Sequence, residues 1–263
     1  MPDLNAEHET AHAGLPFYGS VAGIIMLDST TPRVPGDPGH AATFPFPVHY
    51  EIARGFKVDQ LVEYDPACLG PVVEAAKRLE ALGVNFVATD CGLFSLYQSE
   101  IAGFLSVPFL SSSLVCIPLL LATLNPASKV GILTGHTGYL RDAHLRACAI
   151  DTSRVAIMGM EGYKEFRSSV LEGGATLNAR AISEEVVDAA GRLLQRDPTI
   201  RALVLECTNL SVARRELLSN YGLPVFDLVG AVELFAESVR MRRFGSDFVP
   251  FRPLIERAPA QQK

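Results

Sequence analysis

The sequence predicts an α/β protein built from two pseudo-symmetric lobes with mainly parallel sheets, and an active site in the cleft between them. Short apolar runs alternate along the chain with segments of helical spacing, a pattern typical of parallel strands covered by helices. The first half of this pattern resembles the second, as expected for a duplicated unit. The apolar runs that we interpret as strands are residues 21–27, 84–88, 107–110, 130–133, 202–205 and 224–226.

The two halves share a strand motif and a helix motif. The strand segment at 23–25 (Gly-Ile-Ile) resembles the segment at 131–133 (Gly-Ile-Leu). The helical segment at 75–79 (Ala-Ala-Lys-Arg-Leu) resembles the segment at 189–193 (Ala-Ala-Gly-Arg-Leu). Because both motifs recur in the same order, we expect the lobes to be related by a pseudo-two-fold axis.

Each half also contains a strand that ends in an acid followed by a cysteine, Asp90-Cys91 and Glu206-Cys207. From each cysteine to the proline of the next short strand the separation is the same, 17 residues. Ligands of parallel sheets bind beyond the carboxyl ends of the strands, so we expect both thiols to face one cleft. One thiolate could then remove a proton from carbon while the opposing thiol delivers a proton to the other face. The sequence therefore predicts Cys91 and Cys207 as a catalytic pair.

The domain organisation is predicted from the same segments. A helix is expected over 66–82 from its apolar spacing, with Gly83 at its end. The loop from Asp28 to Pro47 contains five prolines and is long enough to form a lid or a substrate-binding wall. The expected divisions are a tail at 1–18, a first lobe at 19–125, a second lobe at 126–227, a helix at 228–245 that packs back on the first lobe, and a tail at 246–263.

Composition argues against several classes of function. The 263 residues carry a net charge of −6 without a cluster of Lys and Arg, so nucleic acid is not an expected partner. The most apolar run, 114–121, is too short to cross a membrane, and no targeting segment is visible, so we expect a cytoplasmic protein. The five cysteines form no C-x-x-C pair, so neither disulfides nor a metal site are expected. The cysteines without a counterpart in the repeat are interpreted as structural: Cys68, Cys116 and Cys148.

The cysteine motifs at 89–92 (Thr-Asp-Cys-Gly) and 206–209 (Glu-Cys-Thr-Asn) resemble those of the aspartate/glutamate racemase superfamily. This superfamily includes hydantoin racemases, maleate isomerases, arylmalonate decarboxylases and a dimethylsulfoniopropionate lyase. The segment at 134–137 (Thr-Gly-His-Thr) looks like its T-x-x-T substrate loop. The resemblance implies a small carboxylate substrate, catalysis without a cofactor by the two cysteines, and a homodimer or higher homo-oligomer. The substrate-binding residues that it implies are Asp28, Ser29, Gly92, Thr134, Gly135, Thr137, Thr208 and Asn209.

Three further residues have both a functional and a structural interpretation. Arg33 could pair with a substrate carboxylate in bidentate fashion, or it could be an ordinary surface arginine. Ser112 follows a strand and could offer a hydroxyl to the cleft, or it could cap the next helix. His136 could contact substrate, or it could be a hydrogen-bonded loop histidine. We include Arg33 and Ser112 among the candidate binding residues.

The leading hypothesis is a racemase or epimerase that inverts the α-carbon of a small carboxylate or amino acid. The main alternative is a lyase of the same superfamily that eliminates a β-leaving group, and the long proline-rich loop resembles that of the lyase branch. A maleate isomerase and a non-catalytic binding protein remain as further alternatives. Gly92 stands where glutamate racemases commonly carry Asn, so standard glutamate racemase activity is not expected. Both cysteines are present, which argues against the arylmalonate decarboxylase type, because that type keeps only the second.

Overall fold

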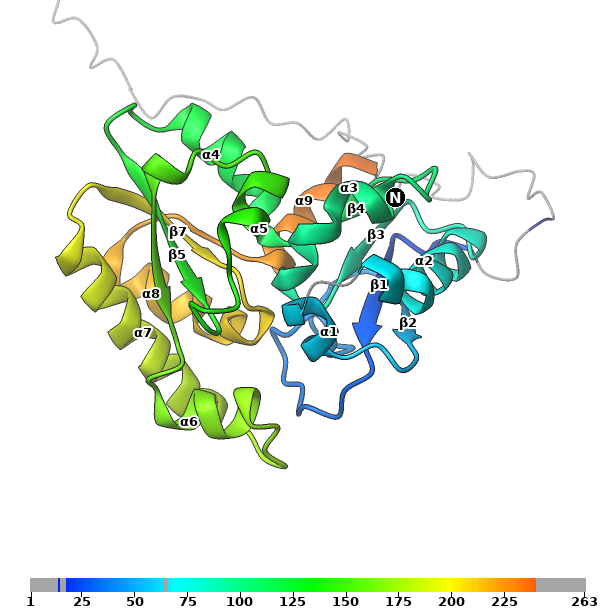
Figure 1. Cartoon of the computed structure of the whole chain (residues 1–263), viewed down its shortest axis with the longest axis horizontal. Coiled ribbons are helices and arrows are strands. Elements are labelled where there is room, and N and C mark those ends of the chain that lie inside the picture. The colour runs from blue at the N-terminus through cyan, green and yellow to red at the C-terminus, as the bar shows by residue number, and fades with distance from the viewer. Residues whose placement is uncertain (1–13, 15–17, 64–65, 240–263) are drawn as a thin grey trace, which may run out of the picture.

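The computed structural model describes residues 14, 18–63 and 66–239, and within them the chain forms two four-stranded parallel sheets (Figure 1). The strand order is β2-β1-β3-β4 in the first sheet and β6-β5-β7-β8 in the second. The two orders are equivalent, which confirms the predicted α/β class. The strands are β1 (Ala22–Leu27), β2 (Val48–Ala53), β3 (Phe86–Thr89), β4 (Phe109–Leu110), β5 (Lys129–Thr134), β6 (Val155–Gly159), β7 (Ile200–Leu205) and β8 (Val225–Phe226).

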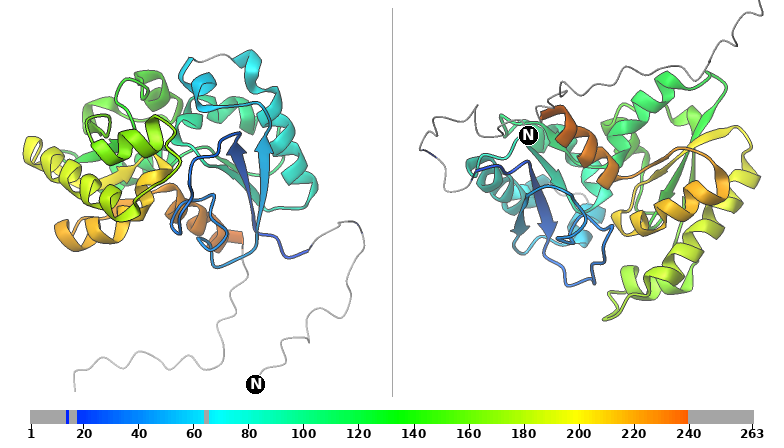
Figure 2. Two further views of the ribbon diagram at one scale, coloured as in Figure 1. Left: turned by 90° about the horizontal axis from the view of Figure 1, so that it is seen from below. Right: turned by 180° about the vertical axis from the view of Figure 1, so that it is seen from behind.

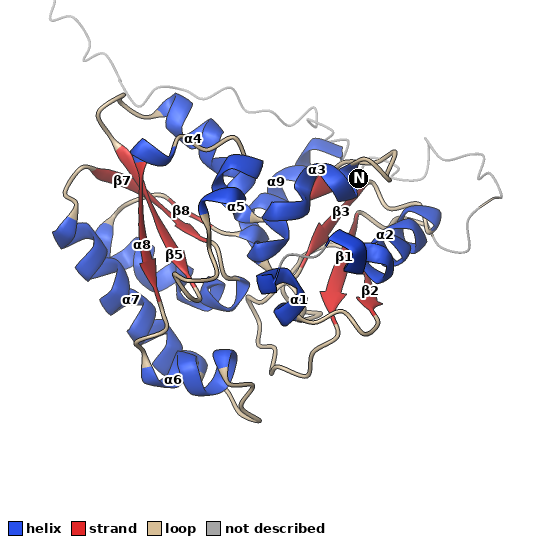
Figure 3. Cartoon of the chain, viewed as in Figure 1, coloured by secondary structure: helices blue, strands red, loops and turns tan. Residues whose placement is uncertain are grey.

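Helices cover both sheets, and Figure 3 shows them around the parallel strands of each lobe. The longest are α7 (Ala179–Arg196), α2 (Gly70–Ala81) and α9 (Leu228–Val239). The shorter α-helices are α1 (Val58–Glu63), α3 (Gln98–Ala102), α4 (Ile117–Thr123), α5 (Asp142–Ala147), α6 (Lys164–Phe166) and α8 (Arg214–Tyr221). Segments of 3-10 helix lie at Pro66–Leu69, Gly92–Tyr97, Ser113–Cys116, Thr152–Arg154 and Thr208–Ala213, and a π-helical turn lies at Arg167–Leu171.

The repeated glycine and leucine of the sequence meet in both lobes. A Cβ on Gly23 of β1 would lie 2.9 Å from the Cβ of Leu79 on α2. A Cβ on Gly131 of β5 would lie 3.0 Å from a methyl of Leu193 on α7. Glycine is therefore needed at both strand positions because each helix leucine packs directly on the strand backbone. The matched motifs thus make the same helix-on-sheet contact twice.

The repeated proline spacing has an equally direct cause. The N–H of Val87 on β3 donates to the carbonyl oxygen of Pro108 at 2.9 Å. The N–H of Leu203 on β7 donates to the carbonyl oxygen of Pro224, also at 2.9 Å. Each proline precedes a two-residue strand, so its missing N–H costs no ladder hydrogen bond there. The equal separations fix equal registers of β4 on β3 and of β8 on β7.

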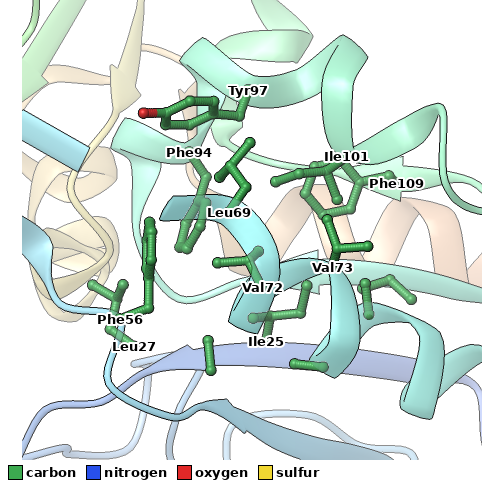
Figure 4. Packing of buried hydrophobic residues seen from close by; sticks show 14 of the residues in the cluster. Ile25, Leu27, Phe56, Leu69, Val72, Val73, Phe94, Tyr97, Ile101 and Phe109 are labelled. Atoms are coloured by element: carbon green, nitrogen blue, oxygen red, sulfur yellow. The ribbon is translucent and has the colours of Figure 1, made fainter. Parts of the chain in front are cut away.

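The apolar core is organised around each sheet. In the first lobe, Phe56 and Phe94 stack with ring centroids 5.9 Å apart, beside Val72 of α2 (Figure 4). On the other face of that sheet, α9 packs against strand residues including Ile24 and Phe86. The last described helix therefore returns to the first lobe after the second is complete, and Figure 2 shows it from below and from behind.

The structure also differs from the sequence-based expectations. The expected helix over 66–82 is a 3-10 turn followed by α2, which begins at Gly70 with Pro71 in its first turn. Strands β2 and β6 were not predicted, because these edge strands are only half-buried and lack the fully apolar pattern of central strands. The expected tails, apart from residues 14 and 18, and the extension of the last helix over 240–245 lie outside the described residues. Among the described residues, no helix has the length and hydropathy needed to span a membrane.

Candidate active site

Both predicted catalytic cysteines line one cavity with a volume of about 250 Å³. Cys91 follows β3 in the first lobe, and Cys207 follows β7 in the second. The ends of β1 and β5 contribute Leu27 and Thr134 to the same cavity. The cavity therefore lies beyond the carboxyl ends of both sheets, where the sequence predicted it.

The two cysteine motifs are held together by hydrogen bonds between the lobes. The hydroxyl of Thr208, next to Cys207, donates to the carbonyl oxygen of Asp90 at 2.6 Å. The hydroxyl of Ser113 donates to the carbonyl oxygen of Leu205 at 2.7 Å. Both bonds are buried, so the segments that carry the thiols are fixed relative to each other.

Most of the predicted site residues line this cavity, but three do not. Ser112 is buried, and its Oγ accepts the N–H of Leu114, which is the helix-capping interpretation. The hydroxyl of Thr137 donates to the carboxylate of Glu161 outside the cavity. Gly92 is buried against the neighbouring lobe and is not part of the cavity wall. The predicted residues that do line the cavity are Asp28, Ser29, Arg33, Cys91, Thr134, Gly135, Cys207, Thr208 and Asn209.

The two thiols lie in an environment that favours their neutral form. Burial is the main cause that raises the pKa of the Cys91 thiol, and the negative charges of Glu206 and Asp90 raise it further. Burial also raises the pKa of the Cys207 thiol, again with Glu206 as the next cause. The thiolate needed for proton abstraction must therefore be formed by a nearby proton acceptor or favoured by a nearby cation.

Arg33 is held between two buried carboxylates. Its guanidinium lies 3.0 Å from the carboxylate of Asp37 and 2.5 Å from that of Asp90. Asp37 also accepts the side-chain N–H of Asn209 in the second lobe at 3.2 Å. Asp90 also accepts the backbone N–H of Leu27 at 3.1 Å. The proline-rich loop is thus tied both to the end of β1 and to the second cysteine motif.

This pairing changes the predicted role of Arg33. The sequence suggested a bidentate contact with a substrate carboxylate, but two protein carboxylates occupy the guanidinium nitrogens that such a contact would use. Burial raises the pKa of Asp90, and the charge of Arg33 opposes that rise. Arg33 therefore neutralises the acid beside Cys91 and anchors the loop.

Glu206 of the second lobe packs directly against Gly92 of the first lobe. The carboxylate of Glu206 is buried and accepts the hydroxyl of Thr134 at 2.7 Å. A Cβ on Gly92 would lie 2.1 Å from the backbone oxygen of Glu206 and 2.4 Å from its Oε1. The absence of a side chain after Cys91 is what allows this acid to approach.

We expect the substitution Gly92→Ala to lower the free energy of unfolding by about 1–3 kcal/mol or more, as overpacking does in cores. The nearest atom is a backbone oxygen, so no side-chain rotation can relieve the clash. Urea unfolding measures the change. Gly162→Ala is the matched control, because a Cβ there meets nothing within 4 Å. A Gly92→Ala protein as stable as the Gly162→Ala protein would contradict this packing.

No family model matches the sequence of this chain. The chain is 27% identical to a dimethylsulfoniopropionate lyase from Durusdinium sp. clade D, over 85% of this chain and 76% of that protein. It is 26% identical to dimethylsulfoniopropionate lyase 7 from Emiliania huxleyi, over 85% of this chain and 68% of that protein.

Solved structures with the same architecture include enzymes of several activities. A cysteine-substituted arylmalonate decarboxylase superposes with a TM-score of 0.57 at 16% identity, covering 86% of this chain and 97% of the other. An allantoin racemase from Klebsiella pneumoniae gives 0.55 at 15% identity, covering 83% and 86%. A glutamate racemase from Bacillus anthracis gives 0.53 at 13% identity, covering 84% and 81%. These enzymes are members of the aspartate/glutamate racemase superfamily, and this chain shares their fold.

On this superfamily fold, the cavity carries several groups that sequence reasoning did not assign to the site. The sequence identified the acids Asp90 and Glu206 only as part of the repeat. Their positions directly before Cys91 and Cys207 could have predicted that they line the site. His136 lines the cavity and stacks on Tyr139 with ring centroids 4.2 Å apart. Its Nδ1 accepts the N–H of Gly138 at 3.0 Å, as expected of a hydrogen-bonded loop histidine. The other unassigned lining residues are Thr31, Lys57, Val58, Asp59, Val62, Leu93, Val170 and Leu171.

The charged groups of the cavity wall are predominantly acidic. The carboxylates among the described lining residues outnumber the lysine and arginine side chains, and the pair formed by Arg33 and Asp90 leaves this excess unchanged. Because the wall has a low dielectric constant, such an excess of acid favours a ligand that brings a positive charge. The carboxylates are Asp28, Asp59, Asp90 and Glu206, and the cations are Arg33 and Lys57.

Proposed function

We propose that the chain is a cofactor-independent lyase that removes an α-proton from a small carboxylate and expels a cationic β-substituent. The observation that carries this proposal is the acidic wall around the two thiols. A positive charge on the substrate offsets the acids and lowers the free energy of forming a thiolate between them. The similarity over most of the chain to dimethylsulfoniopropionate lyases makes a sulfonium the first substrate to test.

The chemistry is a β-elimination. The thiolate of one cysteine takes a proton from the carbon next to the carboxylate, and that carbon's electron pair forms the new double bond. The carbon–sulfur bond breaks, and the sulfide departs with its bonding electrons. Dimethylsulfoniopropionate would thus yield acrylate, dimethyl sulfide and one proton.

The experiment is to incubate the protein with dimethylsulfoniopropionate and measure dimethyl sulfide in the headspace and acrylate by NMR. Equal amounts of the two products are expected. 3-(Methylthio)propionate is the matched ligand without the positive charge. We expect it to inhibit at least about tenfold more weakly than zwitterionic 3-(trimethylammonio)propionate, which corresponds to a difference in binding free energy of about 1.4 kcal/mol. Absence of both products, or equal inhibition by the two analogues, would contradict the proposal.

Racemisation is the second candidate, and one observation favours it. Thiols from both lobes line the same cavity, which is the arrangement that inversion of a carbon centre requires. The enantiomers of aspartate and glutamate and a chiral hydantoin should therefore be run in parallel and followed by circular dichroism. Loss of optical activity with no elimination product would establish a racemase in place of the lyase.

A further inference from the structure

Glu206 lies between the two cysteine motifs. It directly precedes Cys207 in the sequence, and its Oε1 faces Gly92, the residue that follows Cys91. The side chain is buried within the cavity wall, and Thr134 donates to its Oε2 at 2.7 Å. Oε1 is therefore directed toward the first cysteine motif while Oε2 is fixed in the second lobe.

The electrostatic influence of Glu206 reaches both thiols. Among the charged groups that raise the pKa of Cys91, Glu206 has the largest effect, and the same is true for Cys207. Burial raises the pKa of Glu206 itself from 4.5 to about 7, although the hydroxyl of Thr134 opposes this rise. At neutral pH the carboxyl can therefore either hold or release a proton, which neither thiol does readily alone.

We propose that Glu206 is the internal proton acceptor that converts the base cysteine from thiol to thiolate. The proton moves from Sγ to the carboxylate, and the thiolate then takes the α-proton and becomes a thiol again. The sulfide leaves with the electrons of the carbon–sulfur bond, and the Glu206 carboxyl releases its proton to water. One proton is released per turnover, as the overall elimination requires. This assignment rests on the proposed function and adds a third proton-handling group to the two cysteines.

The first test compares the pH dependence of kcat for wild type and Glu206→Gln. Glutamine has the same shape and can still accept the hydroxyl of Thr134, so the packing is retained. The wild-type rate should rise with pH through about 7, because the unprotonated carboxylate is the active form. The glutamine variant should lose about 100-fold or more at pH 7, and its rate should rise only at more alkaline pH.

Two further variants separate proton transfer from structure. Glu206→Ala leaves room for a small acid, and added formate should restore activity to this variant but not to Glu206→Gln. Glu161→Gln is the control, because that carboxylate binds Thr137 outside the cavity and its loss should leave the pH profile unchanged. A Glu206→Gln enzyme within threefold of wild type, with the same acid limb, would overturn the proposal.

A measurement without substrate distinguishes failure of this inference from failure of the proposed function. The rate of iodoacetamide labelling of Cys91 and Cys207 is read by peptide mass spectrometry from pH 5 to 10. If a proton is shared between thiol and carboxyl, the wild-type rate rises to about pH 7 and then levels, whereas the Glu206→Gln rate rises steadily with pH. Identical profiles would overturn the role of Glu206 whether or not a substrate is known. If labelling behaves as expected but no sulfide forms, only the proposed lyase activity fails.

Discussion

Replacing both Cys91 and Cys207 by serine is expected to lower kcat by at least about a thousandfold, within the range that acid–base groups contribute. Serine keeps the size of the side chain, but its hydroxyl is far less acidic than a thiol, so no base forms between the acids of the cavity wall. The rate of dimethyl sulfide release measures the effect. Circular dichroism of the variant should match that of wild type.

The control for this experiment is Cys116→Ser, because Cys116 is partly buried outside the cavity. Its activity should remain close to that of wild type. The single variants distinguish elimination from racemisation. An elimination needs one base, so one of Cys91→Ser and Cys207→Ser should lose far more activity than the other, whereas a racemase needs both. Activity that survives in the double variant would contradict any role for the thiols.

The substitution Arg33→Met should lower the free energy of unfolding by about 3–5 kcal/mol at pH 7, as removal of one partner from a buried ion pair does. The side chains of Asp37 and Asp90 are 1% and 0% exposed, so both would be left as unpaired buried charges. Without Arg33, burial raises the pKa of Asp90 further, because the charge that mainly opposes this rise is gone. The folded variant therefore binds more protons than its unfolded chain, so the destabilisation should shrink as the pH falls from 7 to 4.5.

Urea unfolding at the two pH values measures this dependence. Arg180→Met is the control, because that arginine and its partner Glu184 are 89% and 68% exposed and their pair contributes little. It should change stability by less than about 0.5 kcal/mol at either pH. A loss for Arg33→Met that is no larger than the control, or that grows on acidification, would contradict the buried network.

The fold could be predicted because the same local sequence patterns occur in both lobes. The glycines at 23 and 131 and the leucines at 79 and 193 meet in equivalent helix-on-sheet contacts, and equal spacing placed Pro108 and Pro224 in equivalent registers. Such features can be recognised from short segments of sequence. The positions of Cys91 and Cys207 followed from them, because the end of a parallel strand is where a ligand site forms.

The rest of the site depends on contacts that no local pattern encodes. Arg33 meets Asp90 across 57 positions of sequence, so its pairing with protein carboxylates could not be read from the loop alone. The approach of Glu206 to Gly92 joins two lobes and appears only when they are folded together. Sequence reasoning could recognise the acid beside each cysteine, but not that these acids would set the charge of the cavity.

The fate of the α-hydrogen tests the central claim most directly. Wild-type protein would be given dimethylsulfoniopropionate with deuterium at both α-positions and, separately, with deuterium at both β-positions. If a cavity thiolate removes the α-proton, the first substrate yields acrylate with one α-deuterium and reacts more slowly than the second. A product that keeps both α-deuterium atoms, or a rate slowed only by β-deuterium, would contradict proton abstraction at the α-carbon.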